Sequence, residues 1–302
     1  RNGVGLVFGG GGARGFAHLG VWKALHAAGV PIDWVGGTSF GALMAAVVAA
    51  DLPVERVVEV VRRVFRVSPT GDFNWLPMLS LLKGGRARAA IERGIGELFG
   101  GPVDIEDLWK GFFCIASNYS RGCEQRLDTG DLARALRASC AIPGALPPVL
   151  RDGELLCDGG TFNNFPVDAM REMRGVGRVI GVDLGGRIPR RLDLDELPGS
   201  VPLLLDRLRP RARRRFRLPS LTSYLLNVTI LYSVSRQAQA RRQTDLYLNP
   251  PLERIGLLQW ERFEEIFSAG ERHALDVLGA MDAPTKALFG LAQQTGEPCR
   301  AG

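Results

Sequence analysis

Short apolar runs alternate with amphipathic segments along the first half of the chain. Val4 to Phe8 is an apolar run that ends in glycines, which is typical of a buried strand. The spacing of apolar residues predicts helices over Ala13 to Ala28 and Phe40 to Ala50, with a strand at Trp34-Val35 between them. Strands that alternate with helices in this way predict an α/β fold with a largely parallel sheet.

The rest of the chain continues the alternation, with one interruption. Further helices are predicted over Pro53 to Arg66, Leu132 to Ser139, Tyr224 to Ala240 and Trp260 to Leu278, and strands over Phe112 to Asn118, Leu155 to Cys157, Val179 to Leu184 and Asp245 to Leu248. We assign residues 1–281 to one domain, in which 187–218 form an Arg- and Pro-rich surface excursion. Residues 282–302 are expected to be a loosely held tail.

Composition narrows the class of protein. Hydrophobic residues make up 46% and charged residues 23% of the 302 residues, which fits an ordinary globular protein. The five cysteines form no CxxC pair and no histidine is spaced for metal binding, so we expect reduced thiols, a reducing compartment and no metal. No apolar run reaches 18 residues, so no membrane-spanning helix is expected. Because the chain starts at Arg1, we interpret it as part of a longer protein.

The net charge of +6 has a local source. Seven arginines fall within eleven residues: Arg207, Arg209, Arg211, Arg213, Arg214, Arg215 and Arg217. Either a solvated loop or a phosphate-binding patch, in lipid or nucleic acid, would fit this stretch.

A glycine-rich segment, Gly9 to Gly15, lies between the first strand and the first helix. It contains the GxGxxG spacing of dinucleotide-binding loops, but the acidic residue at the required distance, Asp33, precedes its strand and so lies at the wrong end of the sheet. No Gly-Lys-Ser/Thr closes a phosphate loop either. We therefore favour the other use of such a loop, in which backbone N–H groups at a helix N-terminus face an oxyanion.

Gly37-Thr38-Ser39-Phe40-Gly41 is the nucleophile-elbow pattern, and it stands between a strand and a helix as that geometry requires. The alternative is a βα turn in which the serine caps the helix. A serine nucleophile needs a base, but none of His18, His26 and His273 lies in a loop after a strand. Asp158-Gly159-Gly160 does follow a strand, although Asp-Gly is also a common turn pair.

Together these residues resemble the patatin-like phospholipases. The resemblance implies a three-layer α/β/α fold and a Ser-Asp dyad, with Ser39 as nucleophile and Asp158 as base. It also implies oxyanion donors at Gly10, Gly11 and Gly12, a loop held by Arg14, an elbow flanked by Gly37 and Gly41, and no metal or cofactor. The segments Arg137 to Pro148 and Asn163 to Asp168 resemble those on either side of the family's aspartate. Tyr247 to Pro251, with Phe263, Ile266 and Gly270, resembles the neuropathy target esterase branch of the family.

The resemblance implies hydrolysis of carboxylic esters of lipids, with (lyso)phospholipids as leading substrates, through an acyl-Ser39 intermediate. Two alternatives stay open: a membrane- or nucleic-acid-binding module with a vestigial site, and an esterase for small soluble esters. We expect a cytoplasmic protein on a membrane surface, anchored or regulated by segments outside this chain. Anionic lipid is expected to contact Arg207, Arg211, Arg213, Arg214 and Arg215, and nucleic acid is disfavoured.

Residues 68–85 are interrupted by Pro and Gly and carry several large apolar side chains, among them Trp75, Met78 and Leu79. Such a segment is either an ordinary packed loop or an apolar rim beside a lipid site. On sequence alone we favour the packed loop.

Overall fold

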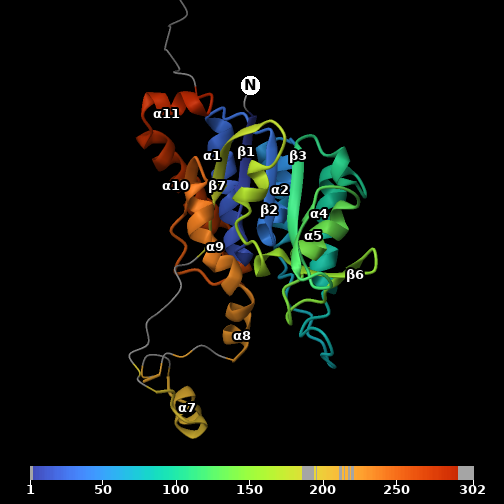
Figure 1. Cartoon of the computed structure of the whole chain (residues 1–302), viewed down its shortest axis with the longest axis vertical. Helices are drawn as coiled ribbons and strands as arrows, with labels where there is room; N and C mark the ends of the chain where they lie inside the picture. The colour runs from blue at the N-terminus through green and yellow to red at the C-terminus, as the bar shows by residue number, and fades with distance from the viewer. Residues whose placement is uncertain are drawn as a thin grey trace, which may run out of the picture.

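The computed structural model describes residues 3–185, 194, 196–210, 213, 215–216, 218 and 221–291. Its centre is an eight-stranded sheet in the order β5-β6-β3-β2-β1-β7-β8, with β4 paired to β3 (Figure 1). The strands are β1 Gly3–Phe8, β2 Trp34–Thr38, β3 Gly111–Asn118, β4 Cys123–Leu127, β5 Val149–Arg151, β6 Glu154–Asp158, β7 Val176–Val182 and β8 Leu246–Leu248. Strands β1, β2, β3, β7 and β8 run parallel, whereas β4 and β6 are antiparallel to β3 and β5 is antiparallel to β6.

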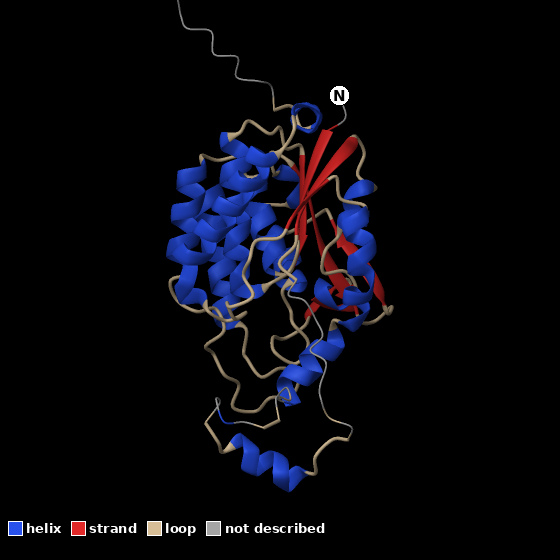
Figure 2. Ribbon diagram, turned by 90° about the vertical axis from the view of Figure 1, so that its left-hand side faces the viewer, coloured by secondary structure: helices blue, strands red, loops and turns tan. Residues whose placement is uncertain are grey.

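Helices cover both faces of the sheet (Figure 2). They are α1 Phe16–Ala27, α2 Phe40–Ala49, α3 Val54–Val64, α4 Gly85–Phe99, α5 Leu132–Ser139, α6 Val167–Arg171, α7 Ser200–Arg207, α8 Leu221–Thr229, α9 Leu231–Arg242, α10 Phe263–Ala280 and α11 Ala283–Leu288. Short 3₁₀ turns are η1 Gly12–Gly15, η2 Ile105–Asp107, η3 Gly159–Thr161 and η5 Trp260–Arg262.

The alternation of side chains along β1 divides the core in two. Leu6 and Phe8 belong to the larger cluster, which includes residues of α1 to α5 and α10. Val7, between them, belongs to a smaller cluster with residues of α6 and α9. The fold is therefore a three-layer α/β/α sandwich with a mostly parallel sheet, as predicted.

Helices α1 and α10 pack backbone to backbone. A Cβ atom on Gly20 would lie 2.0 Å from the Phe267 carbonyl oxygen, and one on Gly270 would lie 2.2 Å from the Ala17 carbonyl oxygen. Because only glycine allows this approach, α10 is held close to the helix that follows the glycine-rich loop.

Several expectations need correction. Helix α4 was not predicted, because its glycines and arginines obscure the apolar stripe of Ala90, Ile91, Ile95 and Leu98. The segment assigned to a loose tail instead forms α11 and buries Phe289, which is 1% exposed, against the core; residues 292–302 lie outside the described part.

Loop 68–85 is not the packed loop that we favoured. Its largest side chains face solvent, with Trp75 95% and Met78 80% exposed.

Candidate active site

Ser39 and Asp158 are neighbours because strands β2 and β6 lie along the same edge of β3 and their carboxyl ends face each other. Thr38 of β2 pairs with Ile115, and Asp158 of β6 pairs with the next residue, Ala116. Strand β4 occupies the opposite edge at the same two positions. Since β2 is parallel and β6 antiparallel to β3, their carboxyl ends point toward each other. The residues that end these strands are thus neighbours, although 119 positions separate Ser39 from Asp158 in the chain.

Ser39 has the backbone of a strained elbow. Its φ of 55° and ψ of −131° lie in a region that L-residues rarely adopt. A Cβ on Gly41 would lie 2.4 Å from the Phe8 carbonyl oxygen, and one on Gly37 would lie 2.7 Å from the Gly41 carbonyl carbon. Both flanking glycines are therefore required by close backbone packing, as an elbow demands. Without a side-chain capping bond, Ser39 does not act as the helix cap that was the alternative.

The Ser139 hydroxyl holds the elbow in place. It accepts a hydrogen bond from the Ser39 N–H at 2.9 Å and donates to the Ile115 carbonyl at 2.6 Å. This link ties the end of α5 and strand β3 to the serine, and it spans 100 residues of sequence.

Asp158 is a buried carboxyl, 5% exposed. Burial raises its pKa to about 6, while hydrogen bonding from the Ser39 hydroxyl and from the Gly160 N–H acts in the opposite direction. Oδ1 accepts from the Gly160 N–H at 2.7 Å. Oδ2 has no well-aligned partner among the described residues, so the contact with Ser39 is close but not an ideal hydrogen bond. In the free protein such contacts are often loose and tighten when substrate binds.

The three glycines of the first motif are not equivalent. The Gly10 N–H donates to the Asn164 carbonyl oxygen at 3.0 Å and is therefore already satisfied. The N–H groups of Gly11 and Gly12 have no acceptor within the described residues, and both glycines are partly exposed. Gly12 has a φ of +55°, and a Cβ there would lie 2.4 Å from the Leu257 carbonyl oxygen. The amides that remain available to a ligand are thus those of Gly11 and Gly12.

Arg14 links this loop to the segment that follows β8. Its Nε donates to the Ile255 carbonyl oxygen at 2.7 Å, and the N–H of the preceding residue, Ala13, donates to the Leu257 carbonyl oxygen at 2.9 Å. Burial lowers the pKa of Arg14, with Glu253 opposing the shift. The hydrogen bond to Ile255 links the glycine loop to residues 253–257, and the supporting role of Arg14 stays a prediction.

Asn164 is a site residue that sequence reasoning did not single out. Its Nδ2 donates to the Gly10 carbonyl oxygen at 3.1 Å, and its own N–H donates to the Ser233 hydroxyl at 2.6 Å. A Cβ on Gly10 would lie 2.3 Å from Asn164 Oδ1 and 3.3 Å from the Ser39 Cβ. Asn164 therefore bridges the glycine loop and the Asp158 loop, a role that the motif Asn163-Asn164 does not reveal by itself.

The histidines lie outside this arrangement. His18 is fully buried, stacks on Phe8 and donates through Nε2 to the Gly9 carbonyl oxygen at 2.8 Å; burial lowers its pKa to about 3. His273 accepts from the Asn249 N–H at 3.1 Å, and His26 is exposed on α1. Of the described residues, no group of three or more His, Cys, Asp or Glu is arranged to hold a metal.

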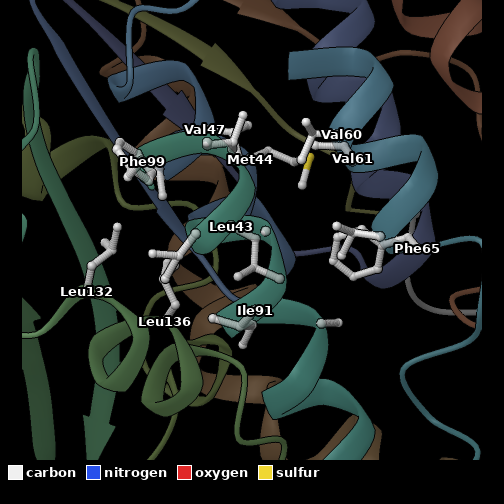
Figure 3. A pocket seen from close by; sticks show the side chains of 16 residues that line it. Leu43, Met44, Val47, Val60, Val61, Phe65, Ile91, Phe99, Leu132 and Leu136 are labelled. Atoms are coloured by element: carbon white, nitrogen blue, oxygen red, sulfur yellow. The ribbon is translucent and has the colours of Figure 1, made fainter. Parts of the chain in front are cut away.

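An apolar cleft lies between α2, α3, α4 and α5 (Figure 3). It contains about 430 Å³ of space, including its open mouth. Leu43, Met44 and Ile91 point into it, together with Val60, Val61, Phe65, Phe99 and Leu136. Leu43 lies one helical turn beyond Ser39 on α2, so the cleft begins near the elbow.

Part of the arginine stretch is described. Arg209 lies 3.6 Å from the buried Asp206, whose Oδ1 also accepts from the Arg215 N–H at 2.9 Å. The side chain of Arg207, and Arg211, Arg214 and Arg217 entirely, lie outside the described residues. In the part of the chain that is described, no helix is both long and apolar enough to cross a membrane.

Comparison with known proteins places the chain in a family. Residues 6–171 match the family model of the patatin-like phospholipases. The chain is 33% identical to Lysophospholipase NTE1 of Candida glabrata over 276 residues, covering 88% of this chain and 15% of that protein. It is 34% identical to human patatin-like phospholipase domain-containing protein 6 over 289 residues, covering 92% and 20%.

The crystal structure of VipD from Legionella pneumophila is a more distant match, with a TM-score of 0.46 and 15% identity over 93% of this chain and 67% of that one. The chain spans a fifth or less of the length of the two curated relatives, Lysophospholipase NTE1 and human patatin-like phospholipase domain-containing protein 6. Their names confirm the resemblance to the neuropathy target esterase branch. The chain belongs to the patatin-like phospholipase family.

Proposed function

We propose that the chain hydrolyses carboxylic esters of lipids, with (lyso)phospholipids as substrates, through an acyl-Ser39 intermediate. The observation that carries this proposal is the meeting of the strained Ser39 elbow with the buried Asp158 carboxyl at adjacent positions of β3. The names of the curated relatives, a lysophospholipase and a patatin-like phospholipase domain-containing protein, support the same substrate class.

In the first step, Asp158 accepts the proton of the Ser39 hydroxyl as Oγ attacks the ester carbonyl carbon. The negative charge that develops on the carbonyl oxygen is stabilised by the N–H groups of Gly11 and Gly12, at the start of η1. The C–O bond then breaks, and Asp158 returns the proton to the departing alcohol. In the second step Asp158 takes a proton from water, whose oxygen attacks the acyl carbon. The bond between the acyl carbon and Oγ then breaks, and Asp158 returns the proton to Oγ, which releases the fatty acid and restores Ser39 and the ionised carboxylate.

A pKa of about 6 suits Asp158 to both halves of this cycle. A carboxyl at its ordinary pKa of about 3.9 is a much weaker base. Burial brings the carboxyl closer to neutrality, so that it is ionised at pH 7 yet readily protonated during the reaction.

The apolar cleft beside α2 supports a long-chain acyl group over a small soluble ester, because it offers apolar side chains from one turn beyond Ser39 onward. A series of esters with acyl chains of increasing length tests this choice. Activity that is highest on two-carbon acyl groups would favour the small-ester alternative. We further infer that substrate is met at a membrane surface, with the Arg-rich stretch near anionic headgroups.

The decisive experiment is labelling with a fluorophosphonate probe followed by mass-spectrometric mapping. We expect one labelled residue, Ser39, and loss of lysophospholipid hydrolysis in Ser39→Ala by at least about 10⁴-fold. Ser235→Ala, which changes an exposed serine on α9, is the matched control and keeps full activity. Labelling at another residue, or normal activity in Ser39→Ala, would refute the proposal.

A further inference from the structure

The segment between α3 and α4 exposes apolar side chains to an unusual degree. Residues 73–82, here called the apolar loop, contain no charged residue. Its exposed fractions reach 95% for Trp75, 80% for Met78, 75% for Phe73 and 71% for Leu79. Single exposed apolar residues need no explanation, but a contiguous group of this size marks an interaction surface.

The apolar loop has a defined backbone. Its ends pair as a short antiparallel bridge between Phe73 and Leu82, and the Asn74 N–H donates to the Leu81 carbonyl oxygen at 2.8 Å. At its base the Lys83 N–H donates to the Asp72 carbonyl oxygen at 2.8 Å, and inside it the Ser80 hydroxyl donates to the Leu82 carbonyl at 2.7 Å. These bonds turn Ser80 and Leu82 inward and leave the aromatic and aliphatic side chains outside.

The apolar loop is joined to the segment that holds Asp158. The N–H groups of Leu81 and Leu82 donate to the carbonyl oxygens of Gly144 and Ala145 at 2.9 and 3.0 Å. Three residues earlier, the Ala141 carbonyl accepts from the Asp158 N–H at 2.9 Å. The loop therefore extends from the same end of the molecule as the site, at the lower end of Figure 1, where α8 also projects.

Charge at the base of the apolar loop favours phospholipid as its partner. Lys83 follows the loop directly, and Arg86 lies in the first turn of α4. Both are exposed, and neither side chain forms an ion pair with a carboxylate of the described residues, although the Arg86 backbone N–H donates to the Asp72 carboxylate at 3.0 Å. Aromatic and aliphatic side chains at a tip with cations behind them match the acyl and headgroup layers of a membrane surface. Residues 73–82 contain no carboxylate. The Asp72 carboxylate at the base is partly buried and accepts the Arg86 N–H, so the exposed charges that face headgroups there are the two cations.

We propose that the apolar loop inserts into the interface of a phospholipid membrane and brings the Ser39 site to its substrate. This inference rests on the proposed function. Trp75 and Met78 are the anchoring side chains, and Lys83 and Arg86 contact the phosphates. The loop is a docking element, and it takes no part in bond breaking.

The test separates docking from hydrolysis. In a Ser39→Ala background, which cannot consume lipid, binding to vesicles of phosphatidylcholine and phosphatidylserine (4:1) is measured by sedimentation. We expect the double change Trp75→Ser and Met78→Ser to weaken vesicle binding by about tenfold or more, because each side chain leaves the membrane for water. In the active protein the same change leaves hydrolysis of a soluble short-chain ester unaltered.

Trp109→Ser is the matched control, since Trp109 is 80% exposed but precedes β3, at the opposite end of the parallel strands. It keeps full vesicle binding. Equal binding by the double variant and the parent would overturn the proposal, as would an equal loss in Trp109→Ser. A monomer–dimer shift with unchanged vesicle binding would assign the loop to a second copy instead. Loop-dependent binding without any ester hydrolysis by the active protein would overturn the proposed function alone.

Discussion

Apolar side chains are usually buried and ionisable ones exposed, and two neighbouring parts of this molecule depart from this rule in opposite directions. Asp158, a carboxyl, is 5% exposed, whereas Trp75, the largest apolar side chain of its loop, is 95% exposed. Both belong to segments that are hydrogen-bonded to residues 141–145. Elsewhere the core follows the rule, with Leu6, Phe8 and Phe16 at 0% exposure.

The comparison teaches that buried ionisable groups and exposed apolar side chains concentrate at functional sites. Burying an ionisable group and exposing an indole ring are both unfavourable for folding alone. A buried carboxyl gains basicity, and an exposed apolar loop gains contact with an apolar phase. On the proposed function and the proposed docking role, the two departures have separate consequences, and a substitution at one segment leaves the other unchanged.

The largest effect is expected from Asp158→Asn. Hydrolysis should fall by on the order of 10⁴-fold, because the amide cannot accept the Ser39 proton. Stability should change in the other direction. The folded-state pKa of about 6 is above the ordinary value, so stability is lost as pH rises through 6 and the buried carboxylate ionises. At pH 8 the neutral amide should raise the free energy of unfolding by on the order of 1–3 kcal/mol.

Hydrolysis assays check the loss of activity, and denaturant unfolding at pH 8 and pH 4 checks the gain in stability. The increase in the free energy of unfolding caused by Asp158→Asn should be smaller at pH 4 than at pH 8. His273→Ala serves as the control and should retain hydrolysis. Equal inactivation by His273→Ala without unfolding would contradict an aspartate base.

An intermediate effect is expected from pH itself. Since Asp158 must be ionised to act as a base, kcat/KM on a soluble ester should fall about tenfold between pH 8 and pH 5, with a midpoint near 6. Assays across this range, with circular dichroism to confirm folding, provide the measurement. A midpoint near 4 would mean that burial does not raise the pKa of the Asp158 carboxyl.

The smallest effect is expected from Trp75→Ser on stability. An indole that touches little in the fold should change the free energy of unfolding by no more than about 0.5 kcal/mol. Leu6→Ala, at a fully buried position, should instead cost about 2–5 kcal/mol. Chemical denaturation of both variants makes the comparison, and a large loss in Trp75→Ser would show that the apolar loop packs after all.

Local sequence patterns predicted an element correctly where the residues of that one segment are enough to identify it. The apolar run of β1, the amphipathic stripe of α3 and the Gly-Thr-Ser-Phe-Gly elbow were all visible in sequence. Helix α4 was missed, because glycines interrupt it, and so was β4, because an edge strand reading Cys-Glu-Gln-Arg-Leu has no apolar alternation. Phe289 was assigned to a loose tail, since nothing in its own segment shows that it joins the larger core cluster.

The sequence by itself determined the family, the α/β layering, and the identity of Ser39 and Asp158 as candidates, because each depends on short motifs and on local periodicity. Only the tertiary structure decided that β2 and β6 end on adjacent residues of β3, that Asn164 takes the Gly10 N–H and leaves those of Gly11 and Gly12 available, and that the apolar loop faces outward. These depend on contacts between residues far apart in the chain, and the free energy of such contacts is decided by packing and burial.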